Sequence, residues 1–234
     1  MGREARVDVM PILMNVADEN DGHAVPSVDG SVYDARMVTV RQQPGSQTDA
    51  ALAAYADLLR KWNGTINLVS AADLPLLWPR HIEDSLQLGS IAGPLPPRAI
   101  DLGSGAGFPG LILAIAFGIQ VELIEQDQRK AAFLREAVIV TGAPARVHAM
   151  KIEQARLPPA PLVVSRALAP LRGLLRFASP LLTEDGFCLF HKSRAAEPEI
   201  TEAERHWSMK IERIPSRTDA NGMILRVSDL HPIG

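Results

Sequence analysis

The sequence predicts an α/β fold with a mostly parallel, Rossmann-like sheet, and three observations support this prediction. Short apolar runs alternate with helical patterns along residues 98–234, as in βαβ units. A glycine-rich loop, "GSGAGFPG", directly follows the first apolar run. An acidic residue, Glu125, ends the second run. A loop and an acid at these two places are typical of ligands that carry a ribose and bind at the carboxyl edge of such a sheet.

Composition describes an ordinary globular chain. The 234 residues are 47% hydrophobic and 22% charged, and the formal net charge of −3 argues against a generally basic nucleic-acid binder. No apolar run approaches the ~20 residues that span a bilayer, and the N-terminal segment is a poor secretory signal. The single cysteine, Cys188, excludes an internal disulfide and fits a reducing compartment. We therefore expect a cytoplasmic protein without a membrane partner.

The chain is expected to have three regions. Residues 1–47 lack periodicity and are rich in Gly, Pro, Asp and Gln, which predicts a flexible N-terminal extension; Met37 is an alternative natural start. Residues 48–97 are expected to form a helical subdomain that ends at the proline-rich "GPLPP". Residues 98–234 are expected to form the Rossmann-like domain.

The helical subdomain is expected to contain two helical segments. Leu52, Tyr55, Leu59 and Trp62 recur at helical spacing, and Gly64 supplies a stop. The stretch "DLPLLWPRHIEDSLQL" has a second helical pattern, which a proline interrupts.

The larger domain is expected to alternate strands and helices and to end in a hairpin. The expected strands are Ala99–Leu102, Val121–Glu125, Arg146–Met150, Leu162–Ser165 and Phe187–His191. The expected helices are Gly110–Phe117, Arg129–Val140, a short Ile152–Arg156 and Leu171–Leu182. After residue 195 we expect one more helix, then the hairpin "MKIERIP" and "MILRVSDL" around the turn "DANG".

The glycine loop fits two kinds of ligand. Read from Gly105, it gives G-A-G-F-P-G, a match to the dinucleotide fingerprint G-x-G-x-x-G. Read from Asp101, it gives D-L-G-S-G-A-G, the form associated with S-adenosylmethionine enzymes. Glu125 suits both ligands, because each carries a ribose whose hydroxyls can donate hydrogen bonds to a carboxylate.

The charge of Asp101 favours S-adenosylmethionine. This acid stands two residues before the first glycine, at the carboxyl end of the strand. A carboxylate there would repel a pyrophosphate but would favour a sulfonium and an ammonium. The alternative, in which Asp101 only caps the turn or the next helix, is compatible with either ligand.

The sequence after the fourth expected strand, together with the single cysteine, limits which chemical group can be the methyl acceptor. Amino-group methyltransferases commonly carry an Asn/Asp-Pro-Pro-Tyr/Phe motif there, whereas this chain reads "VVSRALAP". Carbon methylation of pyrimidines generally needs a cysteine nucleophile, but Cys188 lies in an apolar strand pattern that indicates a buried packing role. Guanine N7 has an outward lone pair and loses no proton, so its methylation can rest on alignment of the reactants.

Several stretches resemble one known family. They are "WNGTINLVS", "RHIEDSL", "IDLGSGAGFPGLILAI", "LIEQDQRKAAFLREA" and "SRALAPL". These stretches, between residues 49 and 192, resemble the small-subunit (16S) ribosomal RNA guanine-N7 methyltransferases, also called the glucose-inhibited division protein B family. The resemblance implies a class I S-adenosylmethionine-dependent methyltransferase with a seven-stranded, mostly parallel Rossmann-like sheet and an N-terminal helical subdomain.

The loop argument and the resemblance together define the expected site. The expected cofactor-binding residues are Asp101, Gly103, Gly105, Phe108, Glu125, Ile152, Glu153 and Arg166. Glu125 would hold the ribose, and the Ile152–Glu153 pair would lie beside the adenine. Arg166 matches an arginine at the junction of cofactor and substrate, and so would be the catalytic, positioning residue. No metal ion is expected.

The resemblance also implies RNA contacts. The expected RNA-binding residues are His81, Lys151 and Lys192. A surface or capping role would account for His81 equally simply, and an ion pair at the strand end is the alternative for Arg166. Lys151 stands where relatives have arginine, and a lysine lacks the planar fork of a guanidinium. The expected partner is small-subunit ribosomal RNA or the 30S particle, bound by a monomer.

Recognition of the base follows from the chemistry. If N7 is the nucleophile, an arginine across O6 and N7 is blocked, so the protein should read O6 or the Watson–Crick edge of an unstacked guanine. Two other functions stay open at this point. One is an NAD(P)-dependent oxidoreductase, and the other is a non-catalytic RNA-binding or assembly protein with an S-adenosylmethionine pocket.

Overall fold

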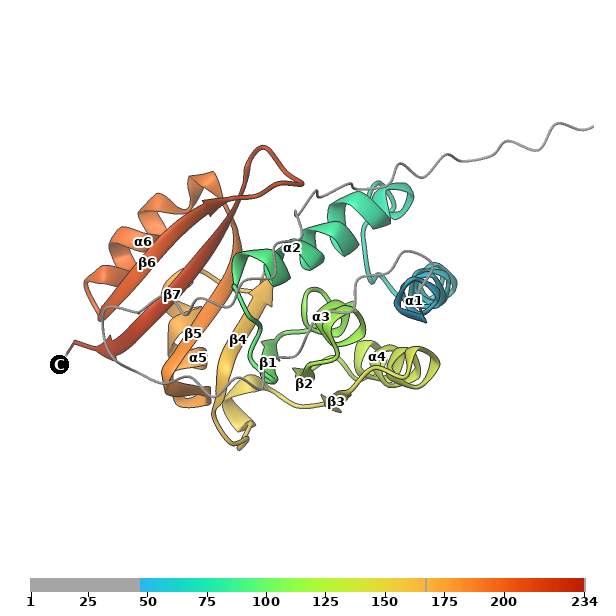
Figure 1. Cartoon of the computed structure of the whole chain (residues 1–234), viewed down its shortest axis with the longest axis horizontal. Helices are drawn as coiled ribbons and strands as arrows, with labels where there is room; N and C mark the ends of the chain where they lie inside the picture. The colour runs from blue at the N-terminus through green and yellow to red at the C-terminus, as the bar shows by residue number, and fades with distance from the viewer. Residues whose placement is uncertain (1–46, 167, 234) are drawn as a thin grey trace, which may run out of the picture. The chain divides into compact units, whose positions relative to one another are not determined.

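The computed structural model of the chain describes residues 47–166 and 168–233. The expected flexible extension and the alternative start at Met37 therefore lie outside the described residues, except for Gln47. The described residues alternate strands and helices as the sequence predicts, and Figure 1 shows their arrangement.

A seven-stranded sheet forms the centre of the fold, in the order β3-β2-β1-β4-β5-β7-β6. Its strands are β1 (Arg98–Leu102), β2 (Gln120–Ile124), β3 (Ala145–His148), β4 (Ala160–Arg166), β5 (Leu182–Ser193), β6 (Trp207–Pro215) and β7 (Gly222–Pro232). The first five strands pair in parallel, whereas β7 pairs antiparallel with both β5 and β6. The expected mostly parallel sheet and closing hairpin are confirmed.

Helices cover both faces of the sheet (Figure 1). On one face lie α1 (Gln47–Asn63), α2 (Glu83–Ile91), α3 (Gly110–Phe117) and α4 (Gln128–Thr141); on the other lie α5 (Leu171–Ala178) and α6 (Glu197–Glu204). A hydrophobic core lies on each face of the sheet, and alternate strand residues point into one or the other. Ala99 packs with the first group of helices, and its neighbour Ile100 packs with the second. This alternation follows from the two-residue period of a strand.

Short helical turns complete the chain. They are the 3₁₀ turns Leu74–Leu76, Ile152–Gln154, Ser179–Leu181 and Arg194–Ala196, and the π-helical turn Trp78–Ile82. The π-helical turn contains Pro79, so the interruption expected in the second helical segment is confirmed. The helix expected over Leu171–Leu182 is wrong beyond Ala178, because Pro180 lacks the N–H that a continued α-helix needs.

The order of the parallel strands determines where a ligand site can form. The chain moves from β1 outward to β3 and then returns to the other side of β1 as β4. Ligands of open α/β sheets bind at such a reversal of strand order, beyond the carboxyl ends of the strands. In this fold the reversal lies between β1 and β4, so a ligand site is expected at the loops that follow these two strands.

Candidate active site

The glycine loop turns sharply between β1 and α3. Gly103, Gly105 and Gly107 have φ angles of +69°, +55° and +98°, a region that residues with a side chain rarely adopt. A Cβ at Gly110 would lie 2.6 Å from the carboxyl group of Asp101. The loop therefore brings bare backbone to the carboxyl edge of β1, where a ligand can approach it closely.

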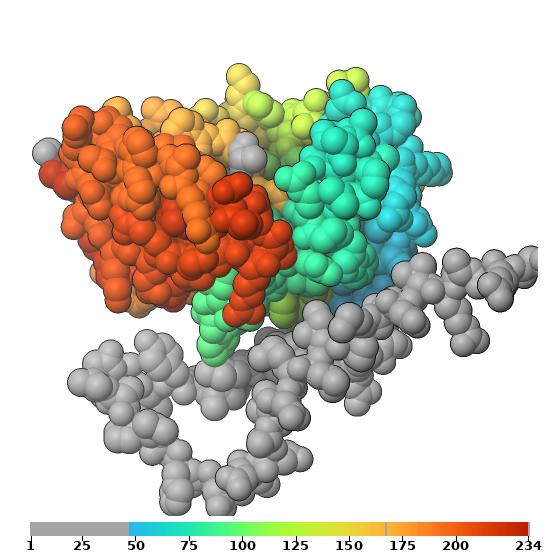
Figure 2. Space-filling model, turned by 90° about the horizontal axis from the view of Figure 1, so that it is seen from above, coloured from blue at the N-terminus to red at the C-terminus, as the bar shows by residue number. Residues whose placement is uncertain are grey.

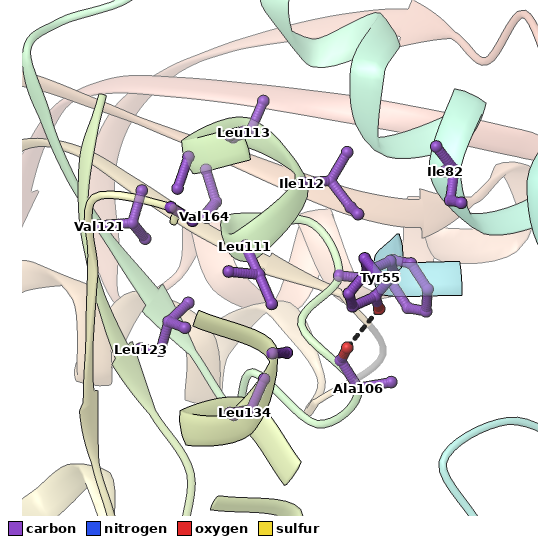
Figure 3. Close-up of a cluster of buried hydrophobic side chains, with 14 of the residues drawn as sticks. Tyr55, Ile82, Ala106, Leu111, Ile112, Leu113, Val121, Leu123, Leu134 and Val164 are labelled. Atoms are coloured by element: carbon purple, nitrogen blue, oxygen red, sulfur yellow. Dashed lines mark hydrogen bonds between the residues drawn. The ribbon is translucent and has the colours of Figure 1, made fainter. Parts of the chain in front are cut away.

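Helix α1 supports this loop. The Tyr55 hydroxyl, from α1, donates a hydrogen bond to the Ala106 carbonyl, as the dashed line in Figure 3 shows. The Tyr55 ring also meets the Phe108 ring edge-on, at 5.8 Å between ring centres. Tyr55 is completely buried, and this burial raises the pKa of its hydroxyl well above the usual value. The hydroxyl therefore stays a donor over the whole physiological pH range.

Asp101 lies beneath the glycine loop instead of at the mouth of a cleft. The residue is completely buried, and its Oδ2 accepts a hydrogen bond of 3.3 Å from the Gly110 N–H. Its Oδ1 has no partner among the described residues. Burial raises the pKa of this carboxyl to about 7, and nearby Glu125 contributes in the same direction. The structure thus includes the bracing contact of the alternative interpretation, and the cofactor role of Asp101 stays a prediction.

Glu125 connects the end of β2 to the glycine loop. Its Oε2 accepts the Gly105 N–H at 2.8 Å, and its Oε1 accepts the Asp127 N–H at 2.7 Å. A carboxylate has about four lone-pair sites, so two remain for donors from a ligand. The position beside the glycine backbone is the one that a ribose requires.

A hollow of about 500 Å³ lies between the segments that follow β2 and β3. Lys151 and Gln154 line it, together with Asp127 and its neighbours. Of the pair expected beside the adenine, Ile152 packs partly into the core and Glu153 is exposed. Lys151 is exposed at the rim of the hollow.

A second cleft, of about 400 Å³, opens at the carboxyl ends of β4 and β5. Three segments far apart in the sequence wall it: the Trp78–Ile82 turn with α2, the ends of these two strands, and the loop between β6 and β7. Figure 2 shows the orange-to-red C-terminal part beside the teal segment that includes α2. We call this the acceptor cleft.

Arg166 stands between the glycine loop and the acceptor cleft. Its guanidinium carbon lies 5.4 Å from the centre of the Phe108 ring, and its Nη1 lies 3.3 Å from Asp84 Oδ2. Its Nη2 contacts His81 Nδ1. The structure therefore brings three of the predicted site residues, Phe108, Arg166 and His81, into one group.

His81 is stacked on the glycine loop. Its ring lies 5.0 Å from that of Phe108, tilted by 20°, and only 7% of the residue is exposed. Burial lowers the pKa of His81 to about 4, with Arg166 as the second cause. The ring is therefore neutral at physiological pH. Its Nε2 has no partner among the described residues.

Lys192 is held by protein groups. Its ammonium donates to Glu199 Oε2 at 2.7 Å and to the Ala169 carbonyl at 2.8 Å, and only 11% of the side chain is exposed. Glu199 Oε2 also accepts the Leu171 N–H, so these contacts tie the start of α5 to α6. Two of the three ammonium hydrogens are thus engaged, and one is left for the RNA contact that the sequence predicts.

Sequence reasoning missed the group that joins the walls of the acceptor cleft. Asp84 Oδ1 accepts Thr218 Oγ1 and Gln87 Nε2, each at 2.6 Å, and the Asp84 carbonyl lies 3.0 Å from His191 Nε2. Gln87 Oε1 accepts the Arg217 N–H. "RHIEDSL" singled out this segment, but the strand ends and the β6–β7 loop that Asp84 contacts lie more than 80 positions away, which no local pattern reveals.

Cys188 is completely buried in β5, and burial raises the pKa of its thiol. This confirms the expected packing role. A thiol that stays protonated and lies out of reach is a poor nucleophile.

Fold and loop together define the class of protein. A ribosomal protein L11 methylase from Lactobacillus delbrueckii subsp. bulgaricus is similar over 65% of this chain and 79% of its own, with a TM-score of 0.54 and 17% identity. The tRNA methyltransferase TrmI from Aquifex aeolicus is similar over 65% and 69%, with a TM-score of 0.51 and 13% identity. The fold is that of the class I S-adenosylmethionine-dependent methyltransferases.

Sequence comparison gives the particular family. Residues 48–220 match the family described as rRNA small subunit methyltransferase G. The relative of that name from Gluconobacter oxydans is 56% identical over 193 residues, which are 82% of this chain and 97% of that protein. The one from Rhodospirillum centenum is 54% identical over 78% of this chain and 85% of that protein. The chain therefore belongs to the rRNA small subunit methyltransferase G family. In the described part of the chain, no helix is long and apolar enough to cross a membrane.

Proposed function

We propose that this chain transfers a methyl group from S-adenosylmethionine to N7 of a guanine in small-subunit (16S) ribosomal RNA. Family membership makes it an rRNA methyltransferase that uses S-adenosylmethionine. The observation that supports the proposal most strongly is the junction of Phe108, His81 and Arg166, where the glycine loop meets a cleft walled by three distant segments. A methyl donor on the loop and an acceptor base in the cleft would meet there.

The residues present fit the cofactor. Within the described part of the chain, Asp101 Oδ1 is buried without a partner, and a cationic ligand above the loop would stabilise the charged form of this carboxyl group. The positive φ angles at positions 103 and 105 favour glycine, so no side chain stands between the backbone of Gly103 and Gly105 and the ligand. Glu125 would accept the ribose hydroxyls, and the hollow near Ile152 and Glu153 would take the adenine.

The acceptor chemistry asks little of the protein beyond alignment. When bound, S-adenosylmethionine supplies an activated methyl group, and a guanine N7 lone pair can attack it without losing a proton. Holding the two reactants in line is worth roughly 7–11 kcal/mol in a well-oriented case. Arg166, braced by Asp84 and resting on Phe108, would fix the side of the cleft next to the reacting atoms.

The proposal also covers the residues that contact RNA, the RNA partner and the compartment in which the protein works. Lys151 at the rim of the outer hollow would meet RNA phosphate, as would the remaining ammonium hydrogen of Lys192. His81 would contact the base in the acceptor cleft. We propose that the protein works as a cytoplasmic monomer on small-subunit ribosomal RNA or on the 30S particle.

Transfer of a labelled methyl group tests the function directly. Small-subunit particles from cells that lack the protein are incubated with purified protein and labelled S-adenosylmethionine, and the RNA is digested to nucleosides. We expect label in 7-methylguanosine, in about one mole per mole of particle. Label in another nucleoside would overturn the choice of N7. Binding of S-adenosylmethionine without transfer would favour a non-catalytic assembly protein, and binding of NAD alone would favour an oxidoreductase.

A further inference from the structure

His81 Nε2, at the junction of the two sites, has no hydrogen-bonding partner among the described residues. His81 is 7% exposed and lines the acceptor cleft, and its Nε2 is buried without a partner in the described part of the chain. A buried polar group left unpaired costs about 1–3 kcal/mol, so proteins seldom keep one without a use. The position of His81 between Phe108 and Arg166 suggests that the use involves the bound substrate.

The contacts of His81 determine which nitrogen carries the proton. Arg166 Nη2 contacts Nδ1 of the ring, and a guanidinium nitrogen only donates hydrogen bonds. Nδ1 must therefore be the acceptor. A neutral imidazole carries its single proton on the other nitrogen, so the unpaired group of His81 is an Nε2–H donor.

We propose that His81 Nε2–H is a specificity-determining group that donates a hydrogen bond to O6 of the acceptor guanine. This inference rests on the proposed function and names the group that reads the base. Guanine presents an acceptor at position 6, whereas adenine presents an amino donor there. A donor at this position therefore favours guanine, because with adenine two donors would face one another. A donor at O6 also leaves the neighbouring N7 lone pair free to attack.

The neutral state of His81 suits this role. Methyl transfer moves positive charge from the sulfonium to the guanine, so a cationic donor at O6 would oppose the reaction by repulsion. A neutral donor keeps the hydrogen bond without that penalty. Charged side chains from neighbouring segments surround the ring: Asp73, Arg80, Asp84 and Arg166. Burial and the two arginines outweigh the two aspartates and hold the pKa of His81 at about 4.

Substitution of His81 combined with substitution of the base tests the contact. His81→Phe keeps a ring on Phe108 but removes the donor, whereas His81→Gln places an amide N–H near the position of Nε2. Each protein is assayed on small-subunit RNA that carries guanine, inosine or 2-aminopurine at the methyl-accepting position. Inosine keeps O6, and 2-aminopurine lacks it. Thermal unfolding and the Kd for S-adenosylmethionine are measured for every variant.

On guanine and inosine RNA, we expect His81→Phe to lower kcat/KM roughly 10- to 100-fold. His81→Gln should stay within about fivefold of the wild type, because it restores a donor. On 2-aminopurine RNA the wild type and His81→Phe should be equally slow, since the partner atom is gone. The Kd for S-adenosylmethionine should be the same in all three proteins.

Two results would overturn the inference. If His81→Phe is slower than the wild type by the same factor on 2-aminopurine RNA as on guanine RNA, the ring acts through structure alone. If the Kd for S-adenosylmethionine rises in step with the loss of activity, the donor serves the cofactor. Should His81→Phe not fold, His81→Leu is the second donor-free variant. Failure of the wild type to methylate guanine RNA would contradict the proposed function instead and would be seen first.

Discussion

Binding of S-adenosylmethionine should be coupled to the protonation state of the Asp101 carboxyl group. Burial holds the pKa of its carboxyl at about 7 in the chain without ligand, so near neutral pH the charged and neutral forms are both present. A sulfonium and an ammonium above the loop would favour the charged form and lower this pKa. Cofactor binding should then release a proton from Asp101 when the pH lies below about 7.

This coupling predicts that affinity for S-adenosylmethionine rises with pH. The charged form makes up about a tenth of the free protein at pH 6 and about nine tenths at pH 8, so the Kd should fall up to about tenfold between them. Asp101→Asn cannot ionise at this position, so the Kd of this variant should lack the part of the pH dependence that comes from Asp101. Calorimetric titration of both proteins from pH 6 to pH 8 measures the difference.

The comparison with Asp101→Asn also removes the titration of the ligand itself, which is common to both proteins. At pH 8 the wild type should bind more tightly, and near pH 6 the two affinities should converge. Equal pH slopes in the two proteins would show that Asp101 only braces Gly110. Circular dichroism at each pH checks that both proteins stay folded.

Sequence reasoning was most successful for residues whose role is set locally. Glu125 directly follows β2 and the glycines directly follow β1, so the fold itself brings them together at the carboxyl edge of the sheet. Phe108, Arg166 and His81 were also predicted, and the structure brings them together. Asp84 and His191 were missed, because their importance comes from contacts between segments more than 100 positions apart. The buried position of Asp101 was missed as well, since side-chain burial depends on how α3 folds back over the strand.

At the scale of elements, helix α1 acts as a support for the cofactor loop. Tyr55 donates from the middle of this helix to the Ala106 carbonyl, whereas Trp62 near its end donates to Glu136 on α4 at 2.9 Å. Both contacts fasten α1 to the rest of the fold, but only the first touches the glycine loop. The pair therefore allows a matched comparison.

We predict that Tyr55→Phe raises the Kd for S-adenosylmethionine, whereas Trp62→Phe, which also removes a contact of α1, does not. The change removes one hydroxyl and leaves the Ala106 carbonyl buried without its donor, which costs about 1–3 kcal/mol. Because the cost falls on the loop, the Kd for S-adenosylmethionine should rise about tenfold. Trp62→Phe should lower the free energy of unfolding by a similar amount but leave that Kd within about twofold. Equal effects of the two substitutions on the Kd would refute the supporting role of Tyr55.

The order of strands and helices could be read from the sequence almost completely, and the exceptions have physical causes. Strand β5 begins at Leu182, five residues before the expected Phe187, because Leu182 pairs with Ala160 across an irregular step in the ladder. That pairing is a tertiary contact, and the segment "TEDG" within it reads as a turn. Pro180, by contrast, was visible in the sequence and ends the α-helical part of the preceding segment.

At the scale of the whole molecule, α2 and the β6–β7 loop, which are far apart in the sequence, meet around the acceptor cleft. Gln87 and Asp84 of α2 hold Ser216 and Thr218 of the β6–β7 loop, while Arg166 and His191 approach from the sheet. The cleft thus exists only in the complete fold.

The central claim is methylation of guanine N7 in small-subunit ribosomal RNA, and mapping of that RNA tests it most directly. Ribosomal RNA is prepared from cells with and without this protein, and N7-methylated guanines are located by reduction and strand cleavage. The account predicts one guanine in small-subunit RNA that is cleaved only when the protein is present. Identical cleavage patterns in the two samples would contradict it.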